Sequence, residues 1–143
     1  MMRFNGSKHG MLVSLIILIL MWLCEFSSVV DAKKHVRITN ELAEGLTLTI
    51  HCKSKDNDLG VHQLAYNTYF EWSFHENIWG TTLFFCNIQW LHGNADFDAY
   101  DAKRSDFACD DCKWFATTDA LYFVDSGTGE SVLYYAWPPP AKP

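Results

Sequence analysis

The sequence predicts an all-β protein: a small antiparallel β-sandwich of about eight strands, stapled by two disulfides. Three observations lead to this prediction. Apolar and polar residues alternate in most segments beyond residue 32, turn-forming residues separate those segments at short intervals, and no segment there has the periodicity of an amphipathic helix. Short strands joined by turns in this way are typical of a sandwich or a small barrel.

The expected strands follow one another along the chain with a period of two. In residues 46–52, Leu48, Ile50 and Cys52 alternate with polar residues, which places one side of the segment on a core and the other toward solvent. The segment 81–90 is apolar on both sides and indicates a central strand. Strands are expected at residues 36–39, 46–52, 70–74, 81–90, 95–101, 112–118, 121–125 and 130–137.

The first 32 residues predict a secretory signal peptide. Arg3 and Lys8 precede a nearly uninterrupted apolar run at residues 11–24, and Val30 and Ala32 place small residues at the −3 and −1 positions of a cleavage site. The run is short for a membrane-spanning helix. We therefore expect cleavage after Ala32, a secreted, extracellular product and no stable membrane insertion afterwards. An uncleaved signal anchor is the alternative.

The rest of the chain is expected to form one domain at residues 33–137, followed by a flexible, proline-rich tail at residues 138–143. Residues 33–143 carry nine Lys or Arg and fifteen Asp or Glu, a net charge of −6 with neutral histidines. An acidic surface argues against nucleic acid as a partner, because phosphate contacts require clustered cations.

Four cysteines lie beyond the predicted cleavage site: Cys52, Cys86, Cys109 and Cys112. An even number in a small secreted chain predicts two disulfides, with three connectivities open. Cys109 and Cys112 also have the spacing of zinc ligands. The oxidising compartment favours disulfides, so no metal or other cofactor is expected.

The sequence does not predict a catalytic site. The histidines are scattered, and the motifs of serine hydrolases, zinc proteases and phosphate-binding loops are absent. Asp56 begins a segment that resembles a calcium loop, but Gly60 occupies the fifth position and Asn67 the twelfth, where that loop needs ligands. Acid–base cleavage of RNA by two histidines is the enzymatic alternative, and the acidic chain argues against it.

Five segments resemble the plant self-incompatibility protein family, the S-protein homologues. Together they cover nearly all of the chain beyond the signal peptide. One departure is Asp119-Ala120, where the family usually has Asp-Gly, which leaves the form of that turn open. The segments are VRITNEL (36–42), LTLTIHCKSKDNDLG (46–60), FEWSFHENIWGTTLFFCNIQW (70–90), FDAYDAKR (97–104) and CKWFATTDALY (112–122).

This resemblance implies a small secreted β-sandwich that acts as a ligand. In the founding members the pistil secretes the protein and a pollen receptor recognises it. This recognition stops the growth of incompatible pollen. We therefore expect a secreted signalling protein that binds an unidentified cell-surface receptor or other protein in plant cell–cell communication, and not an enzyme. The alternative is a secreted effector with direct toxin-like, antimicrobial or nuclease activity.

The charged segment after Cys52 is the candidate partner-binding loop. It contains Lys53, Lys55, Asp56 and Asp58 and leaves a strand that a disulfide anchors. Polar loops on a rigid scaffold commonly carry recognition. The structural alternative is that the two aspartates shape the turn by bonding to the backbone. If the lysines are not the contact surface, loops at residues 91–96 and 102–111 are the next candidates.

Among the three connectivities, we expect Cys52–Cys112 and Cys86–Cys109. Closing a long loop removes more entropy from the unfolded chain, about 3–4 kcal/mol for each bridge. A direct Cys109–Cys112 bridge closes a loop too small to constrain much of the chain.

Overall fold

The computed structural model describes residues 6–25, 32–104, 109–124 and 127–139. The chain divides into two units, residues 1–31 and 32–143. The first contains one described helix, α1 (Gly6–Glu25). None of the described helices combines the length and the apolar character needed to cross a membrane. Cleavage after Ala32 remains a prediction.

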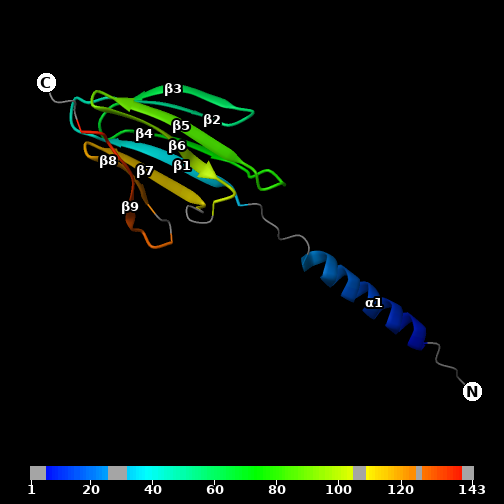
Figure 1. Cartoon of the computed structure of the whole chain (residues 1–143). Coiled ribbons are helices and arrows are strands. Elements are labelled where there is room, and N and C mark those ends of the chain that lie inside the picture. The colour runs from blue at the N-terminus through cyan, green and yellow to red at the C-terminus, as the bar shows by residue number, and fades with distance from the viewer. Residues whose placement is uncertain (1–5, 26–31, 105–108, 125–126, 140–143) are drawn as a thin grey trace, which may run out of the picture. The chain divides into compact units, whose positions relative to one another are not determined.

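The second unit is a sandwich of two sheets (Figure 1), with nine strands in the described residues. One sheet has the strand order β4-β1-β7-β8-β9 and the other the order β3-β2-β5-β6. The strands are β1 (Lys34–Glu41), β2 (Leu48–Lys53), β3 (Asp58–Leu64), β4 (Tyr69–Phe74), β5 (Leu83–Trp90), β6 (Gly93–Asp101), β7 (Asp111–Thr117), β8 (Ala120–Val124) and β9 (Ser131–Ala136).

The β-sandwich class and the two disulfides are confirmed, with two differences from the expectation. β1 pairs with β7 in parallel, whereas the other ladders between described strands are antiparallel. β3 is a ninth strand that the sequence pattern did not indicate. It lies at a sheet edge and is exposed or half-exposed up to Leu64, so it has no alternation of buried and exposed positions to detect.

The core lies between the sheets and consists of the inward-facing residues that alternation predicted. Val36, Ile38, Ile50 and Ile88 are fully buried. Trp114 of β7 joins the two layers, because its indole nitrogen donates a hydrogen bond of 3.1 Å to the carbonyl oxygen of Ala99 in β6 of the opposite sheet.

The predicted disulfide pairing is wrong. The structure joins Cys52 to Cys86 and Cys109 to Cys112. Cys52 and Cys86 are direct partners in the β2–β5 register, and their Cα atoms are 4.1 Å apart. Strand register already brings these two thiols together, so proximity in the folded sheet decides the pairing and loop entropy does not. Because both Cys109 and Cys112 are in a disulfide, the zinc alternative is contradicted as well.

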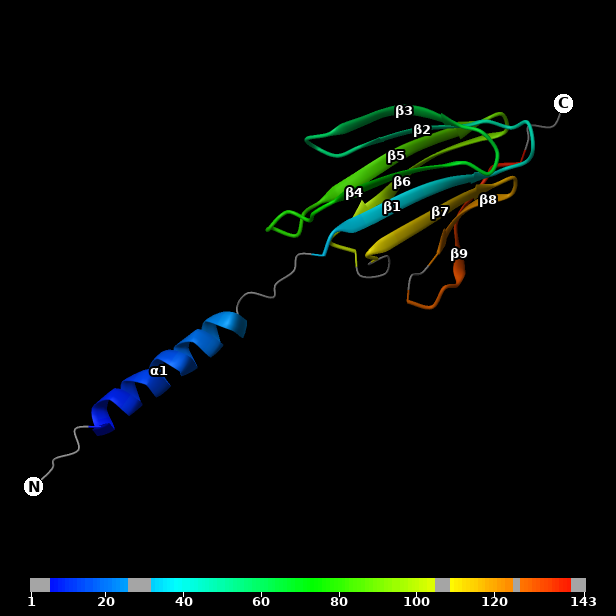
Figure 2. The same ribbon diagram turned by 180° about the vertical axis from the view of Figure 1, so that it is seen from behind.

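The strand registers define two ends of the sandwich. The open end holds the turn between β2 and β3 and the loop between β4 and β5, which project together in Figures 1 and 2. The sealed end holds the start of β2 and the connections that follow β1, β3, β5 and β7. Antiparallel neighbours begin at opposite ends, so each strand contributes one terminus to each end.

Asn40 organises the sealed end. Its side chain is fully buried, and the amide nitrogen donates to the carbonyl oxygens of Leu46 (3.0 Å) and Leu64 (2.8 Å). Its side-chain oxygen accepts a hydrogen bond of 2.9 Å from the backbone N–H of Leu42. One buried amide therefore provides hydrogen-bond partners for two carbonyl oxygens and one N–H. Burying these backbone groups without partners would be costly.

Trp137 and Gly93 close the same end. The indole nitrogen of Trp137 donates to the carbonyl oxygen of Thr117 at 2.7 Å, and its ring centroid lies 5.9 Å from that of Trp90. A Cβ atom on Gly93 would lie 2.8 Å from Nε1 of Trp90 and 2.9 Å from Cε3 of Trp137. Position 93 therefore requires glycine for lack of space. Residues 140–143 of the expected flexible tail lie outside the described residues.

Candidate recognition surface

The charged segment selected from the sequence forms the tight turn between β2 and β3. The backbone N–H of Ser54 donates to the carbonyl oxygen of Asn57 at 2.7 Å, and the N–H of Asn57 donates to the hydroxyl of Ser54 at 3.2 Å. These two bonds fix a four-residue turn and place Lys55 and Asp56 at its exposed tip. Lys53 is the last residue of β2 and is also exposed.

The two aspartates of this segment have different roles. One side-chain oxygen of Asp58 accepts hydrogen bonds from the N–H of Gly60 (2.9 Å) and from Nε2 of His51 (2.7 Å). The bond from Gly60, followed by that from His51, lowers the pKa of Asp58 below its usual value. Gly60 has a φ of 80°, a conformation that suits glycine. Asp58 therefore shapes the start of β3, while Asp56 is exposed at the tip.

The loop between β4 and β5 lies at the same end and is fixed by Asn77. Its side-chain oxygen accepts from the N–H of Thr81 at 2.9 Å, and its side-chain nitrogen donates to the hydroxyl of Thr81, also at 2.9 Å. The backbone N–H of Asn77 donates to the hydroxyl of Thr82 at 2.8 Å. β5 consequently begins at Leu83 and not at residue 81 as expected.

This fixed loop presents two large apolar side chains to solvent. Ile78 is 90% exposed and Trp79 is 79% exposed. Gly80 follows with a φ of 60° and donates its N–H to the carbonyl oxygen of Asn77 at 3.1 Å, which closes the turn beneath them. The exposure of these two residues is built into a hydrogen-bonded turn.

A groove of about 580 Å³ separates the turn from the loop. We call it the tip groove. The turn residues Ser54–Asn57 line one side, and Asn77, Trp79 and Thr81 line the other. The half-exposed side chains of Leu83 and Phe85 line it as well, and Nζ of Lys53 lies 5.5 Å from the ring centroid of Phe85. The tip groove thus has apolar lining residues, with Lys55 and Asp56 on the side of the turn and Lys53 next to it.

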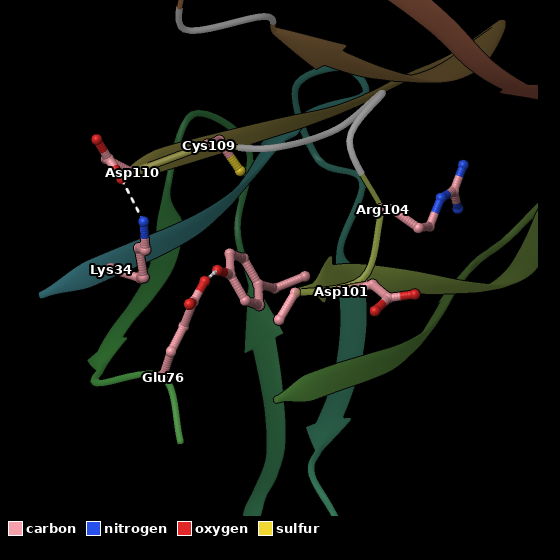
Figure 3. A pocket seen from close by; sticks show the side chains of 8 residues that line it. Lys34, Glu76, Asp101, Arg104, Cys109 and Asp110 are labelled. Atoms are coloured by element: carbon pink, nitrogen blue, oxygen red, sulfur yellow. Dashed lines mark hydrogen bonds and ion pairs between the residues drawn. The ribbon is translucent and has the colours of Figure 1, made fainter. Parts of the chain in front are cut away.

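A smaller, polar pocket of about 260 Å³ lies near the starts of β1 and β7 (Figure 3). Its charges largely satisfy one another. The amine of Lys34 pairs with the carboxylate of Asp110, and the hydroxyl of Tyr100 donates to Glu76. Because these groups bond within the protein, the pocket offers fewer free groups to a ligand than the tip groove does.

The structure brings together part of the predicted site. Lys55 and Asp56 line the tip groove, and Lys53 flanks it, whereas Asp58 belongs to the hairpin. Ile78 and Trp79 were not among the residues predicted from the sequence. A signal was present, since two adjacent large apolar residues inside a turn-forming cluster have no core to bury them. Of the reserve loop 102–111, residues 105–108 lie outside the described residues.

Comparison with known proteins decides the family. The family described as "Plant self-incompatibility protein S1" matches residues 35–137. The chain belongs to this family. The resemblance found from the sequence is therefore confirmed, and the match spans the sandwich from its first strand to Trp137.

Several curated proteins from Arabidopsis thaliana are similar to this S-protein homologue. S-protein homolog 5 is 48% identical over 79 residues, which cover 55% of this chain and 61% of that protein. S-protein homolog 3 is 46% identical over 88 residues, 59% of each chain. The aligned part thus spans about three fifths of these two relatives. S-protein homolog 29 is 35% identical over 133 residues, 93% of this chain and 98% of that protein.

A solved structure has the same fold. It is described as "Structure of SPH (Self-Incompatibility Protein Homologue) proteins, a widespread family of small, highly stable, secreted proteins from plants". It matches with a TM-score of 0.59 and 19% identity, covering 76% of this chain and 99% of that chain. At this identity the likeness supports the sandwich fold and carries no residue roles.

Proposed function

We propose that this S-protein homologue is a secreted recognition protein that binds a cell-surface protein in plant cell–cell communication and has no catalytic role. Membership of the self-incompatibility family supports a role in recognition. The solved relative is described as belonging to a family of secreted plant proteins. The predicted signal peptide supports export of this chain. Pollen–pistil recognition is the process that the family name suggests.

The observation that carries the proposal is the tip groove with its exposed Ile78 and Trp79. Large apolar side chains in water are unfavourable unless a partner covers them, and such patches mark interaction sites. Hydrogen bonds within the turn and the loop hold both sides of the groove. A fixed surface of this kind loses little entropy when it binds.

The test uses the full chain expressed in cultured plant cells with a C-terminal epitope tag. We expect the protein in the medium, with an N-terminus near Lys33. We also expect the collected protein to bind intact plant cells saturably, and brief protease treatment of those cells to abolish the binding because the receptor is a protein.

Two results would contradict this function. Retention of the protein inside the cells would remove its access to a surface receptor. Degradation of RNA or leakage of lipid vesicles by the purified protein would instead support a directly acting effector. The same preparation serves all of these measurements, so the two classes of function can be separated on one sample.

A further inference from the structure

We propose that the tip groove binds an extended, acidic segment of the partner protein, and that an apolar side chain of that segment packs against Trp79. This inference rests on the proposed function, because it names the surface used and the chemistry of what it binds. Its elements are the exposed apolar loop, the groove beside it and two lysines that form no ion pair within the described residues.

The apolar part is contiguous and not a set of scattered residues. Trp79 lines the groove together with Leu83 and Phe85, each 38% exposed, and Ile78 lies next to Trp79 in the chain. Single exposed apolar residues are ordinary on protein surfaces, whereas a contiguous group beside a groove is typical of a binding site. Tryptophan in particular dominates binding energy at such sites.

The charge of the groove points to an acidic partner. Among the described residues, neither Lys53 nor Lys55 forms an ion pair, although Lys53 lies close enough to Asp58 to lower the pKa of that carboxyl. Asp56 lines the groove beside Lys55, whereas the carboxylate of Asp58 is bonded by Gly60 and His51. Two lysines against one carboxylate without a bond inside the hairpin favour a ligand with carboxylates next to an apolar residue.

The dimensions favour an extended segment. The groove holds about 580 Å³ and lies open between the turn and the loop. This space accepts one or two side chains of a chain that passes through it, and pockets of this size are typical of specific sites. A second copy of the protein is a poor occupant, because two molecules of charge −6 repel each other.

The first experiment asks what the groove selects. The secreted wild-type protein is used to select binders from a random peptide library displayed on phage. We expect enriched peptides in which Asp or Glu flanks an aromatic or large aliphatic residue. Peptides without acidic residues, or no enrichment at all, would overturn the inference.

The second experiment locates the binding with matched variants. An enriched peptide is synthesised, and its affinity is measured for the wild type, Ile78→Ser with Trp79→Ser, and Lys53→Ala with Lys55→Ala. We expect losses of about tenfold or more for the apolar variant and about threefold to tenfold for the lysine variant, smaller at high salt. Leu133→Ser is the control, since Leu133 is 56% exposed on the edge strand β9 and does not line the groove.

Unchanged thermal midpoints will show that the variants fold, and equal affinity of the apolar variant and the control would overturn the inference. A bilayer is the competing occupant. Binding of the wild type to phosphatidylcholine vesicles, lost in the apolar variant while peptide affinity is retained, would assign the loop to lipid and overturn the inference as well.

The plant-cell assay separates this inference from the proposed function. If the wild type and the apolar variant bind cells equally, the groove is not the contact surface but the function stands. If the wild type fails to bind cells, the proposed function fails, and the peptide affinities still decide whether the groove is a binding site.

Discussion

The two ends of the sandwich differ in which side chains they bury and which they expose to solvent. At the sealed end, Asn40 is buried with all its hydrogen bonds made, and Trp137 packs over Gly93. At the open end, Ile78 and Trp79 stand in solvent while the polar atoms of Asn77 bond inside the loop. The difference suggests that one end stabilises the fold, and that the other can vary its surface at little cost.

The largest effect is expected from Asn40→Ala at the sealed end. It removes the side-chain hydrogen bonds to two carbonyl oxygens and one N–H, and two of these three bonds are fully buried. The free energy of unfolding should fall by about 3 kcal/mol or more, since each unsatisfied group costs about 1–3 kcal/mol. Urea denaturation measures the change. Asn87→Ala, on an exposed face of β5, is the matched control and should stay within about 0.5 kcal/mol of the wild type. Equal effects of the two changes would show that the sealed end has no special role.

The next effect is expected from Gly93→Ala. The new methyl group would overlap the rings of Trp90 and Trp137, which costs about 1–3 kcal/mol in a packed region. In a Trp137→Leu background the same change should cost less, because one of the two obstructing rings is gone and the ring of Trp90 has room to move. A double-mutant cycle from thermal or urea unfolding tests this coupling. Strict additivity would show that the cost does not come from Trp137 and would assign it to Trp90 or to the backbone of the β5–β6 turn.

A smaller effect concerns acid. The side chain of Asp119 accepts hydrogen bonds from the hydroxyls of Thr117 and Tyr122, and these lower its pKa. A carboxyl group with a lowered folded-state pKa stabilises the protein above the ordinary Asp pKa of about 3.9, and this stabilisation is lost as pH falls through the folded value.

Asp119→Asn keeps an acceptor at this position but does not titrate. Wild type should therefore be more stable than the variant at neutral pH, and the difference should disappear in strong acid. Urea unfolding across the acid range measures it. A stability difference that is independent of pH would mean that the hydrogen bonds of Asp119 do not depend on its charge.

The smallest effect on stability is expected from Lys53→Ala with Lys55→Ala at the open end. Both side chains are exposed, so the free energy of unfolding should change by less than about 0.5 kcal/mol. Asp58→Ala is the informative contrast, because it removes the acceptor for Gly60 and His51 and should lower the thermal midpoint. If the lysine pair proves as destabilising as Asp58→Ala, the two lysines contribute to the structure of the turn and are not a surface that is free for recognition.

Much of the fold could be predicted because burial leaves a period-two trace in the sequence. Leu48, Ile50 and Cys52 face inward as expected. The edge strand β3 left no such trace, and the parallel partner of β1 could not be found from local patterns. The pairing of Cys52 with Cys86 depends on strand register, which joins residues 34 positions apart. Loop-closure entropy is a property of the unfolded chain. It does not determine which thiols are adjacent in the folded protein.

The sequence marked only some of the residues around the tip groove, and their role in recognition stays a prediction. Charge marked Lys53 and Lys55, but the sequence could not separate exposed Asp56 from Asp58, which bonds within the hairpin. Ile78 and Trp79 were passed over because apolar residues among strands are normally taken as core. The Asp119-Ala120 departure, left open by the sequence, is accommodated: Ala120 has no positive φ, and its N–H donates to the hydroxyl of Thr117 at 3.3 Å. Glycine is not needed there.

The parallel pair of β1 and β7 has a consequence for the timing of folding. Residues 35–41, near the beginning of the sandwich, pair with residues 111–117, near its end. The five-stranded sheet cannot close before residue 117 has been synthesised, and contacts between such distant segments form slowly. The four-stranded sheet needs only residues 48–101 and can form earlier, so the five-stranded sheet is the layer that forms late. If the predicted signal peptide directs the chain through a translocation channel, this layer can be completed only after residue 117 has left the channel.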